Sequence, residues 1–252
     1  MCTKYSTTFV FCQTSFKEKE SLLHWVYYMK KKQSRGKFIV FEGIDGAGKT
    51  TQTNLLIKHL KRIGKKVVFI HFPQYQKKSG GLVENYLKGH YGKVGPYQAS
   101  VLYAADRFDG GFRIKKWLKD GYIVLADRYL ASNIGHQGGK IRHTKEREKF
   151  FRWLYCFEYG IFQIPKPSIS FFLKMPPRVA QELLIKLAKK PGKKLDIHEK
   201  DILHLKHAEQ AYLHAAKVFP KDLRLVECTA STTLRTPQDI HNEVWSKVQQ
   251  LL

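Results

Sequence analysis

A Walker A pattern runs from Gly43 to Thr50 and reads Gly-Ile-Asp-Gly-Ala-Gly-Lys-Thr, with every fixed position of the pattern filled. It follows an apolar run at 38–41 that reads as a strand, and it opens an amphipathic stretch at 50–63 that reads as a helix. Glycines let backbone N–H groups turn inward around phosphate oxygens, and the positive end of the helix dipole faces the same anion. The pattern therefore predicts a phosphate-binding loop between a strand and a helix.

The side chains of this loop predict what it binds. We expect Lys49 to reach the β- and γ-phosphates of ATP and the Thr50 hydroxyl to bind Mg²⁺, so ATP and Mg²⁺ are the expected cofactors. The residues expected to bind them are Gly43, Asp45, Gly46, Ala47, Gly48, Lys49, Thr50 and Thr51. The chain has no Asn-Lys-x-Asp motif for reading guanine.

Apolar runs alternate with amphipathic stretches from Lys37 onward. Five runs predict strands, at 38–41, 67–70, 122–126, 169–173 and 223–226. Four stretches predict helices, at 50–63, 97–119, 195–217 and 237–252. Near-continuous apolar runs are typical of parallel strands buried on both faces. The fold class is therefore expected to be α/β: a five-stranded parallel sheet with helices on both faces, plus a short lid.

The chain is expected to contain one such domain, residues 37–252, with the lid at about 186–196 around a Lys-rich stretch. Residues 1–36 read as an N-terminal extension. Two interpretations stay open for residues 1–28: a loosely attached segment, or an artefact of start-site assignment in which Met29 is the true start.

Composition bounds the partners. Lys and Arg number 45 against 21 Asp and Glu, a formal charge of +24. A solvated basic surface explains this excess, and so do polyanionic partners: nucleotides, nucleic acid or an anionic membrane. No run of about 20 apolar residues is present, so no membrane span is expected. The four cysteines lack the spacing of metal or redox motifs, which favours reduced thiols in a cytoplasmic protein.

The third predicted strand ends in Asp127-Arg128-Tyr129. An acid at this edge of a parallel sheet is placed to hold Mg²⁺ together with Thr50, and the adjacent arginine directs a cation at an acceptor phosphate. The alternative is an ion pair that caps the next helix.

Five motifs, in order, resemble those of the thymidylate kinase family. They lie at 41–52, 72–75, 102–107, 127–133 and 196–199. The resemblance implies the P-loop kinase fold, transfer of the γ-phosphoryl group of Mg-ATP to dTMP, giving dTDP, and a homodimer. Nucleic acid is not an expected partner, because the sequence contains no recognisable nucleic-acid-binding module. It also implies the substrate-binding residues, which are Asp45, Phe72, Tyr75, Tyr103, Arg107, Arg128, Ser132, Asn133, His136, Gln137 and Glu199.

The resemblance further implies individual roles. Tyr103 would stack on thymine, while Arg107 and Asn133 would contact the base edge. Asp45 would lie near the 3′-hydroxyl of the sugar, and Glu199 near the metal or the substrate. Purely structural alternatives are helix packing for Tyr103, a helix cap for Asn133 and a solvated helix face for Glu199. The expected catalytic residues are Lys49, Asp127, Arg128, Lys193 and Lys194.

Three positions depart from the family pattern. Gln74 stands where many members carry Arg, His136 where many carry Tyr, and Gly46 where some carry a catalytic Arg. Members without that arginine usually supply one from the lid. In this chain the lid candidate at 189–194 contains lysines but no arginine. One or more of the lid lysines are therefore expected to neutralise charge on the transferring group, unless they are simply solvated; the candidates are Lys189, Lys190, Lys193 and Lys194.

Two other readings remain beside dTMP kinase. One is a related P-loop kinase that acts on another pyrimidine nucleotide or on a deoxynucleoside. The other is a nucleic-acid-binding P-loop ATPase, suggested by the +24 charge. The second would bind DNA with a steep dependence on salt and would leave the acceptor-site motifs unexplained.

Overall fold

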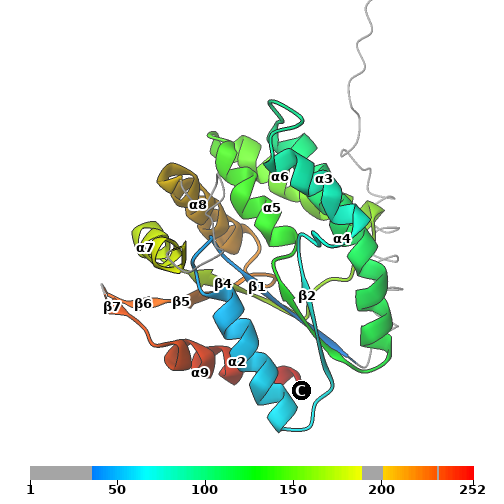
Figure 1. Cartoon of the computed structure of the whole chain (residues 1–252), viewed down its shortest axis with the longest axis vertical. Coiled ribbons are helices and arrows are strands. Elements are labelled where there is room, and N and C mark those ends of the chain that lie inside the picture. The colour runs from blue at the N-terminus through cyan, green and yellow to red at the C-terminus, as the bar shows by residue number, and fades with distance from the viewer. Residues whose placement is uncertain (1–35, 189–200, 232) are drawn as a thin grey trace, which may run out of the picture. The chain divides into compact units, whose positions relative to one another are not determined.

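The computed structural model describes residues 36–188, 201–231 and 233–252. Its centre is a parallel sheet in the order β2-β3-β1-β4-β5, which confirms the predicted fold class (Figure 1). The strands are β1 (Lys37–Glu42), β2 (Val67–His71), β3 (Ile123–Asp127), β4 (Ile169–Lys174) and β5 (Arg224–Glu227). The predicted lid lies mostly outside the described residues.

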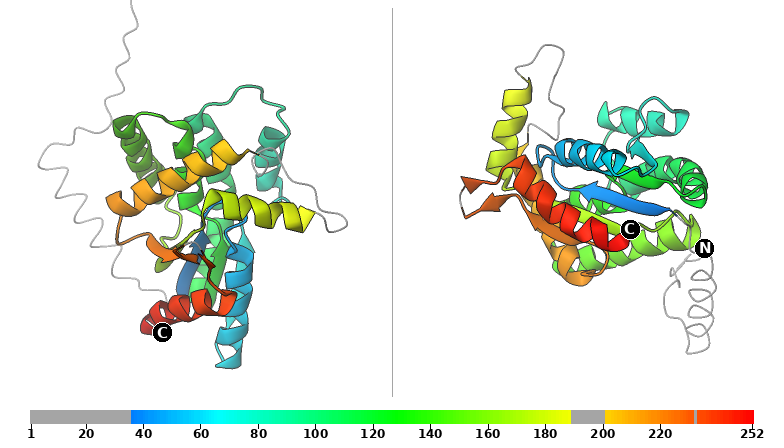
Figure 2. Two further views of the ribbon diagram at one scale, coloured as in Figure 1. Left: turned by 90° about the vertical axis from the view of Figure 1, so that its left-hand side faces the viewer. Right: turned by 90° about the horizontal axis from the view of Figure 1, so that it is seen from below.

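The helices fall on the two faces of the sheet as the strand order requires. They are α2 (Lys49–Arg62), α3 (Lys78–Leu87), α4 (Pro96–Lys119), α5 (Leu130–His136), α6 (Thr144–Tyr155), α7 (Pro177–Ala188), α8 (Ile202–Val218) and α9 (Pro237–Val248). The β1–β2 connection runs across the sheet in one direction and the later connections run in the other. Because parallel crossovers are right-handed, α2 lies on the face opposite α4, α5, α6 and α8. Contacts between α2 and α9, and between α5 and α8, agree with this division (Figure 2).

Short elements complete the described chain. They are the 3₁₀ turns η1 (Gly138–Lys140) and η3 (Gln249–Leu251), the π-helical turn η2 (Cys156–Ile161), and the hairpin strands β6 (Thr229–Ala230) and β7 (Thr233–Leu234). A π-helical turn is uncommon and is often found near functional sites.

The ends of three strands meet at one edge of the sheet. In the strand register, Asp127 lies opposite Phe41 of β1 and opposite His71 of β2. The glycine-rich loop follows β1, the Phe72-Pro73 segment follows β2, and Arg128 follows β3. In open α/β sheets, ligands bind outside the carboxyl ends of the strands, where the strand order reverses. The fold therefore brings the sequence motifs together at this edge.

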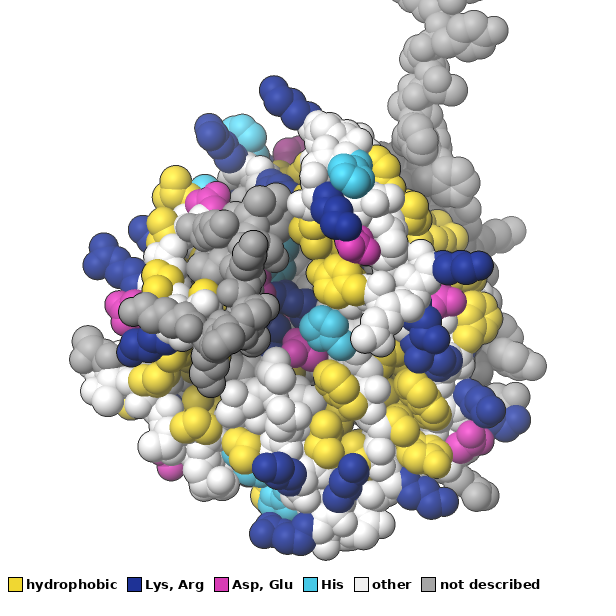
Figure 3. Space-filling model, viewed as in Figure 1, with side chains coloured by type: hydrophobic (Ala, Val, Ile, Leu, Met, Phe, Trp, Pro, Cys, Tyr) yellow, Lys and Arg dark blue, Asp and Glu magenta, His cyan; other side chains and the backbone are white. Residues whose placement is uncertain are grey.

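The surface carries its positive charge widely. Lys and Arg side chains surround the face seen in Figure 3, and acidic, basic and histidine side chains gather in a hollow beyond the N-terminal end of α2. In the described part of the chain, no helix is both long enough and apolar enough to cross a membrane.

Candidate active site

Two neighbouring cavities open at this edge of the sheet. The first, of about 250 Å³, is lined by residues from the β2–α3 segment, α4 and α5. The second, of about 500 Å³, lies between the glycine-rich loop and α7. Asp45, His71 and Arg128 line both cavities. Two ligands bound in these cavities would therefore meet at one shared wall.

The glycine-rich loop holds its lysine inward. Gly43, Gly46 and Gly48 have φ angles of 143°, 81° and 84°, a region open to glycine and strained for other residues. The Lys49 ammonium donates hydrogen bonds to the carbonyl oxygens of Gly43 at 3.1 Å and Ile44 at 2.9 Å. Burial, and then the nearby Arg128, lower the pKa of Lys49. A bound phosphate would replace these carbonyl partners with negatively charged oxygens.

Thr50 and Asp127 form a pair that suits Mg²⁺. The Thr50 hydroxyl donates to Oδ2 of Asp127 at 3.1 Å. Oδ1 of Asp127 is buried, and it has no hydrogen-bond partner among the residues that the structure describes. A buried carboxylate oxygen without a partner is costly unless a ligand satisfies it. Mg²⁺ commonly takes one or two protein oxygens and fills its remaining positions with water and phosphate, so the donor set fits this ion.

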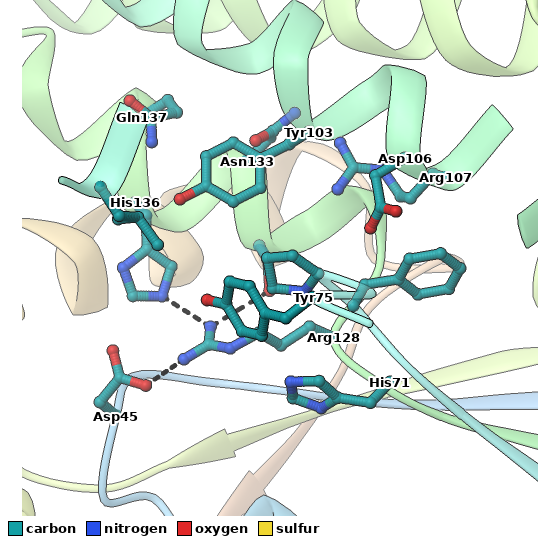
Figure 4. A pocket seen from close by; sticks show the side chains of 14 residues that line it. Asp45, His71, Tyr75, Tyr103, Asp106, Arg107, Arg128, Asn133, His136 and Gln137 are labelled. Carbon is teal, nitrogen blue, oxygen red and sulfur yellow. Dashed lines mark hydrogen bonds and ion pairs between the residues drawn. The ribbon is translucent and has the colours of Figure 1, made fainter. Parts of the chain in front are cut away.

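Arg128 is the hub of the shared wall. Its Nη2 forms an ion pair with Asp45, and its Nη1 lies 2.8 Å from Nε2 of His136 and 3.3 Å from the Ser132 hydroxyl (Figure 4). Burial alone lowers the pKa of Arg128, but Asp45 raises it above its ordinary value. Conversely, burial raises the pKa of Asp45, and the two cations Arg128 and Lys49 hold it well below its ordinary value. Both groups are charged, and an acceptor phosphate would compete with Asp45 for the guanidinium.

The backbone also fixes Arg128. Its φ angle of 70° is left-handed, which is uncommon for a side chain of this size. Its N–H donates to the carbonyl oxygen of Phe41 at 2.9 Å, so β1 holds this conformation. Unusual backbone geometry of this kind is concentrated at functional sites.

The first cavity collects the predicted base-binding residues. Tyr103 and Arg107 come from α4 and Asn133 comes from α5, and all three line this cavity (Figure 4). The other predicted substrate residues found there are Asp45, Phe72, Tyr75, Arg128, Ser132, His136 and Gln137. The structure therefore brings ten of the predicted substrate-binding residues together around one cavity.

Arg107 is held by a residue that the sequence prediction missed. Glu158, in η2, accepts from Nε of Arg107 at 2.5 Å and from Nη2 at 2.8 Å, and both side chains are buried. Asn133 Nδ2 donates to the carbonyl oxygen of Ser100 at 3.1 Å and to Glu158 at 3.4 Å. One edge of the guanidinium is thus fixed by the protein. No motif pointed to Glu158, because its pairing depends on a π-helical turn that the sequence does not reveal.

Glu42 and His71 were also missed. Glu42 is fully buried and accepts from the Tyr129 N–H at 2.8 Å and the Ser132 hydroxyl at 2.6 Å, so it fixes the chain after Arg128. Its position directly after the apolar run at 38–41 was a usable signal, because charged residues are rarely fully buried unless they are paired. Nδ1 of His71 lies 3.9 Å from Oδ2 of Asp127. His71 directly follows the strand predicted at 67–70, and no motif marked it.

Two departures from the family pattern have structural explanations. Gln74 is buried, donates from Nε2 to the backbone carbonyl oxygen and to Oδ1 of Asp106, and accepts from Arg113. It is not among the residues that line the first cavity. At Gly46, an added Cβ would run into the carbonyl oxygen of Ala180 in α7. An arginine at position 46 therefore cannot fit while α7 lies here.

The remaining predicted site residues are Lys193, Lys194 and Glu199. All three lie outside the described residues, together with the Lys-rich centre of the predicted lid. Of the stretch expected to form the lid, Lys186 is described; it belongs to α7 and lines the second cavity.

Comparison with known proteins gives consistent similarities. A family model described as thymidylate kinase matches residues 41–240. The thymidylate kinase of Caldicellulosiruptor saccharolyticus is 32% identical over 219 residues, covering 86% of this chain and 98% of the relative. That of Plasmodium falciparum is 32% identical over 153 residues, or 61% and 68% of the two chains. A solved thymidylate kinase structure from Candida albicans aligns with a TM-score of 0.66 and 23% identity, covering 86% of this chain and 92% of that one.

Proposed function

This chain belongs to the thymidylate kinase family, and from that premise we propose that it transfers the γ-phosphoryl group of Mg-ATP to dTMP. An oxygen of the dTMP phosphate forms a bond to the γ-phosphorus while the bond from that phosphorus to the β–γ bridging oxygen breaks. The products are dTDP and ADP. No general base is needed, because the acceptor phosphate is already largely anionic near neutral pH.

The shared wall of the two cavities is the observation that carries this proposal. ATP phosphates belong in the second cavity, over the glycine-rich loop, and dTMP belongs in the first. Arg128, which lines both cavities, would contact the acceptor phosphate and stabilise the negative charge of the transferring phosphoryl group. Phosphoryl transfer depends on positioning and charge neutralisation, which a cation at the junction provides.

The other residues act around this junction. Lys49 would bind the β- and γ-phosphates, and Thr50 with Asp127 would hold Mg²⁺, which neutralises phosphate charge when bound. Asp45 would release Arg128 to the acceptor phosphate and face the sugar 3′-hydroxyl. Lys193 and Lys194 remain the proposed sources of extra positive charge.

Base selection is proposed to rest on three side chains. Tyr103 would stack on a single pyrimidine ring, and Asn133 and the guanidinium of Arg107, held by Glu158, would meet the edge of the base. We propose that the slot for this one ring lies within the cavity of about 250 Å³ that these side chains line. His136 stands where many family members carry a Tyr that disfavours a ribose 2′-hydroxyl, and both of its ring nitrogens already have partners, Arg128 and His204. We therefore propose that the preference for deoxyribose is weaker than the preference for the base.

Assembly and location complete the proposal. We propose a homodimer in the cytoplasm that binds no nucleic acid. One face of α4 exposes three apolar side chains, Val101, Phe108 and Phe112, which are spaced by seven and then four residues. A second copy of the chain would cover this face. Cys156 and Cys228 are free thiols, as a reducing compartment favours.

A coupled ADP-release assay with Mg-ATP and a panel of nucleoside monophosphates tests the proposed activity. We expect dTMP to be the best acceptor, dUMP to be weaker and purine monophosphates to be poor. Turnover with dGMP or AMP equal to that with dTMP would contradict the one-ring cavity. A reaction that contains Mg-ATP but no nucleoside monophosphate measures ATP hydrolysis and serves as the control.

A further inference from the structure

A chain of hydrogen bonds connects α8 to Arg128 in the active site. His204, in the first turn of α8, places Nε2 3.1 Å from Nδ1 of His136 in α5. His136 in turn places Nε2 2.8 Å from Nη1 of Arg128, and Arg128 is paired with Asp45. We call these four residues the histidine relay. His204 is not among the described residues that line either cavity.

The donors and acceptors of the relay can have only one arrangement. A guanidinium donates and never accepts, so Nε2 of His136 must be the unprotonated nitrogen. Neutral His136 then carries its proton on Nδ1 and donates it to Nε2 of His204, which must accept. Burial, and next the charge of Arg128, lower the pKa of His136 well below 6.5, which is consistent with a neutral ring.

Close packing of α5 and η1 against α8 fixes the distance between the two histidines. An added Cβ at Gly135 would run into the ring of Tyr212, and one at Gly139 would lie 2.9 Å from the carbonyl oxygen of His207. The His136 and His204 rings stack with centroids 5.3 Å apart at 24°. Asp201 caps α8 and accepts from the His204 N–H at 3.2 Å. The relay is therefore held by backbone as well as by side chains.

We propose that His204 is a positioning residue for phosphoryl transfer, holding Arg128 through His136 in the orientation that faces both cavities. The proposal rests on the proposed function of Arg128 as the acceptor-phosphate ligand. Without an acceptor at position 204, the Nδ1 proton of His136 loses its partner and the imidazole loses its fixed tautomer and orientation. Arg128 then keeps its ion pair with Asp45 and its contact with the Ser132 hydroxyl, but its Nη1 no longer meets a His136 nitrogen that is held in place to accept its hydrogen bond.

Three variants of the full chain separate the hydrogen bond from ring packing. His204→Gln keeps a side-chain acceptor without a ring, and His204→Phe keeps a stacking ring without an acceptor. His207→Phe places the same substitution at an exposed position of α8 and serves as the control. We expect His204→Phe to lower kcat/KM for dTMP by about tenfold, with KM for ATP nearly unchanged, and His204→Gln to recover most of that loss. The control should match the parent.

Two kinetic results would overturn the proposal. One is a His204→Phe variant with the parent's kcat/KM for dTMP. The other is an equal loss in the Gln and Phe variants that follows a matching fall in thermal stability, since that marks a purely structural role.

A spectroscopic readout is independent of turnover. In ¹⁵N NMR of the parent protein, His136 should show an unprotonated Nε2 and a protonated Nδ1, and His204→Phe should disturb this signature while His207→Phe should not. The opposite tautomer in the parent would overturn the relay even if every variant failed to fold. If the parent does not phosphorylate dTMP, the assay refutes the proposed function, while the NMR result still decides the relay.

Discussion

At the scale of single residues, the charged groups of the site are held by partners that a bound phosphate would replace. Lys49 binds two backbone carbonyl oxygens, and Arg128 binds Asp45 and His136. Such pairing keeps long side chains in place before substrate arrives, so less conformational entropy is lost on binding. Buried groups with altered pKa values also tie the stability of the site to pH.

His136 predicts acid sensitivity. Its folded-state pKa lies well below 6.5 because of burial and then Arg128, with His204 and Lys49 acting in the same direction and Asp45 opposing. Below about pH 6.5, the unfolded chain binds a proton there that the folded chain does not, so the free energy of unfolding falls as pH falls. The slope for one group is at most about 1.4 kcal/mol per pH unit.

Urea unfolding at pH 7.5 and pH 5.5 measures this effect. The parent should lose more stability between the two pH values than His136→Gln, with His207→Gln as the control. A parent and a His136→Gln variant with the same pH dependence would show that His136 is not kept neutral by folding.

The Arg107–Glu158 pair is expected to contribute strongly to stability. Both side chains are buried, so Glu158→Gln would leave the arginine's charge without a buried counter-ion. Breaking a buried pair from one side typically costs about 3 kcal/mol or more. Urea unfolding should show this loss, and KM for dTMP should rise as Arg107 loses its orientation. Glu146→Gln, which breaks an exposed pair with Lys149, should change stability little; equal effects of the two substitutions would contradict the argument.

At the scale of elements, α7 covers the glycine-rich loop and depends on Gly46. Gly46 and Gly64 have similar φ angles, 81° and 75°, but a Cβ at Gly64 meets nothing within 4 Å, whereas one at Gly46 meets the backbone of Ala180. Both alanine substitutions share the backbone strain, of about 1 kcal/mol. We expect Gly46→Ala, unlike Gly64→Ala, to raise KM for ATP by displacing α7. Equal kinetics in the two variants would show that α7 does not constrain the loop.

The elements themselves were only partly predictable. All five central strands were predicted, because buried parallel strands are apolar throughout, and the starts of α2, α4 and α9 were predicted to within one residue. The helices α3, α5, α6 and α7 were missed. α5 is seven residues long, too short for a clear period, and α3 contains Gly80 and Gly81, which weaken helix propensity. α7 begins at Pro177, a first-turn proline that was a usable signal.

Site residues were predictable where a motif carries them along one stretch of chain. The glycine-rich loop and Asp127-Arg128 are of this kind. Contacts between distant segments were not predictable: His136 and His204 are 68 residues apart, and Arg107 and Glu158 are 51 apart. Such pairs depend on how helices pack and not on local pattern.

At the scale of the whole molecule, residues 1–28 are expected to be dispensable for the reaction. They precede the first core strand and carry none of the sequence motifs. Deleting them should leave kcat, KM for dTMP and the melting temperature nearly unchanged, as measured by the ADP-release assay and thermal unfolding. A truncated chain that loses solubility or melts many degrees lower would show that this segment is part of the folded domain.

The wall shared by the two cavities makes the two binding equilibria interdependent. Asp45, His71 and Arg128 line both cavities. A ligand in one cavity therefore alters the electrostatic field and the available hydrogen-bond partners in the other. Thermodynamic linkage is reciprocal: by whatever factor a bound adenine nucleotide changes the dissociation constant of dTMP, dTMP changes that of the nucleotide by the same factor. A preferred order of substrate addition would then describe only the kinetic route to the ternary complex. The free energy of forming that complex is the same whichever ligand binds first.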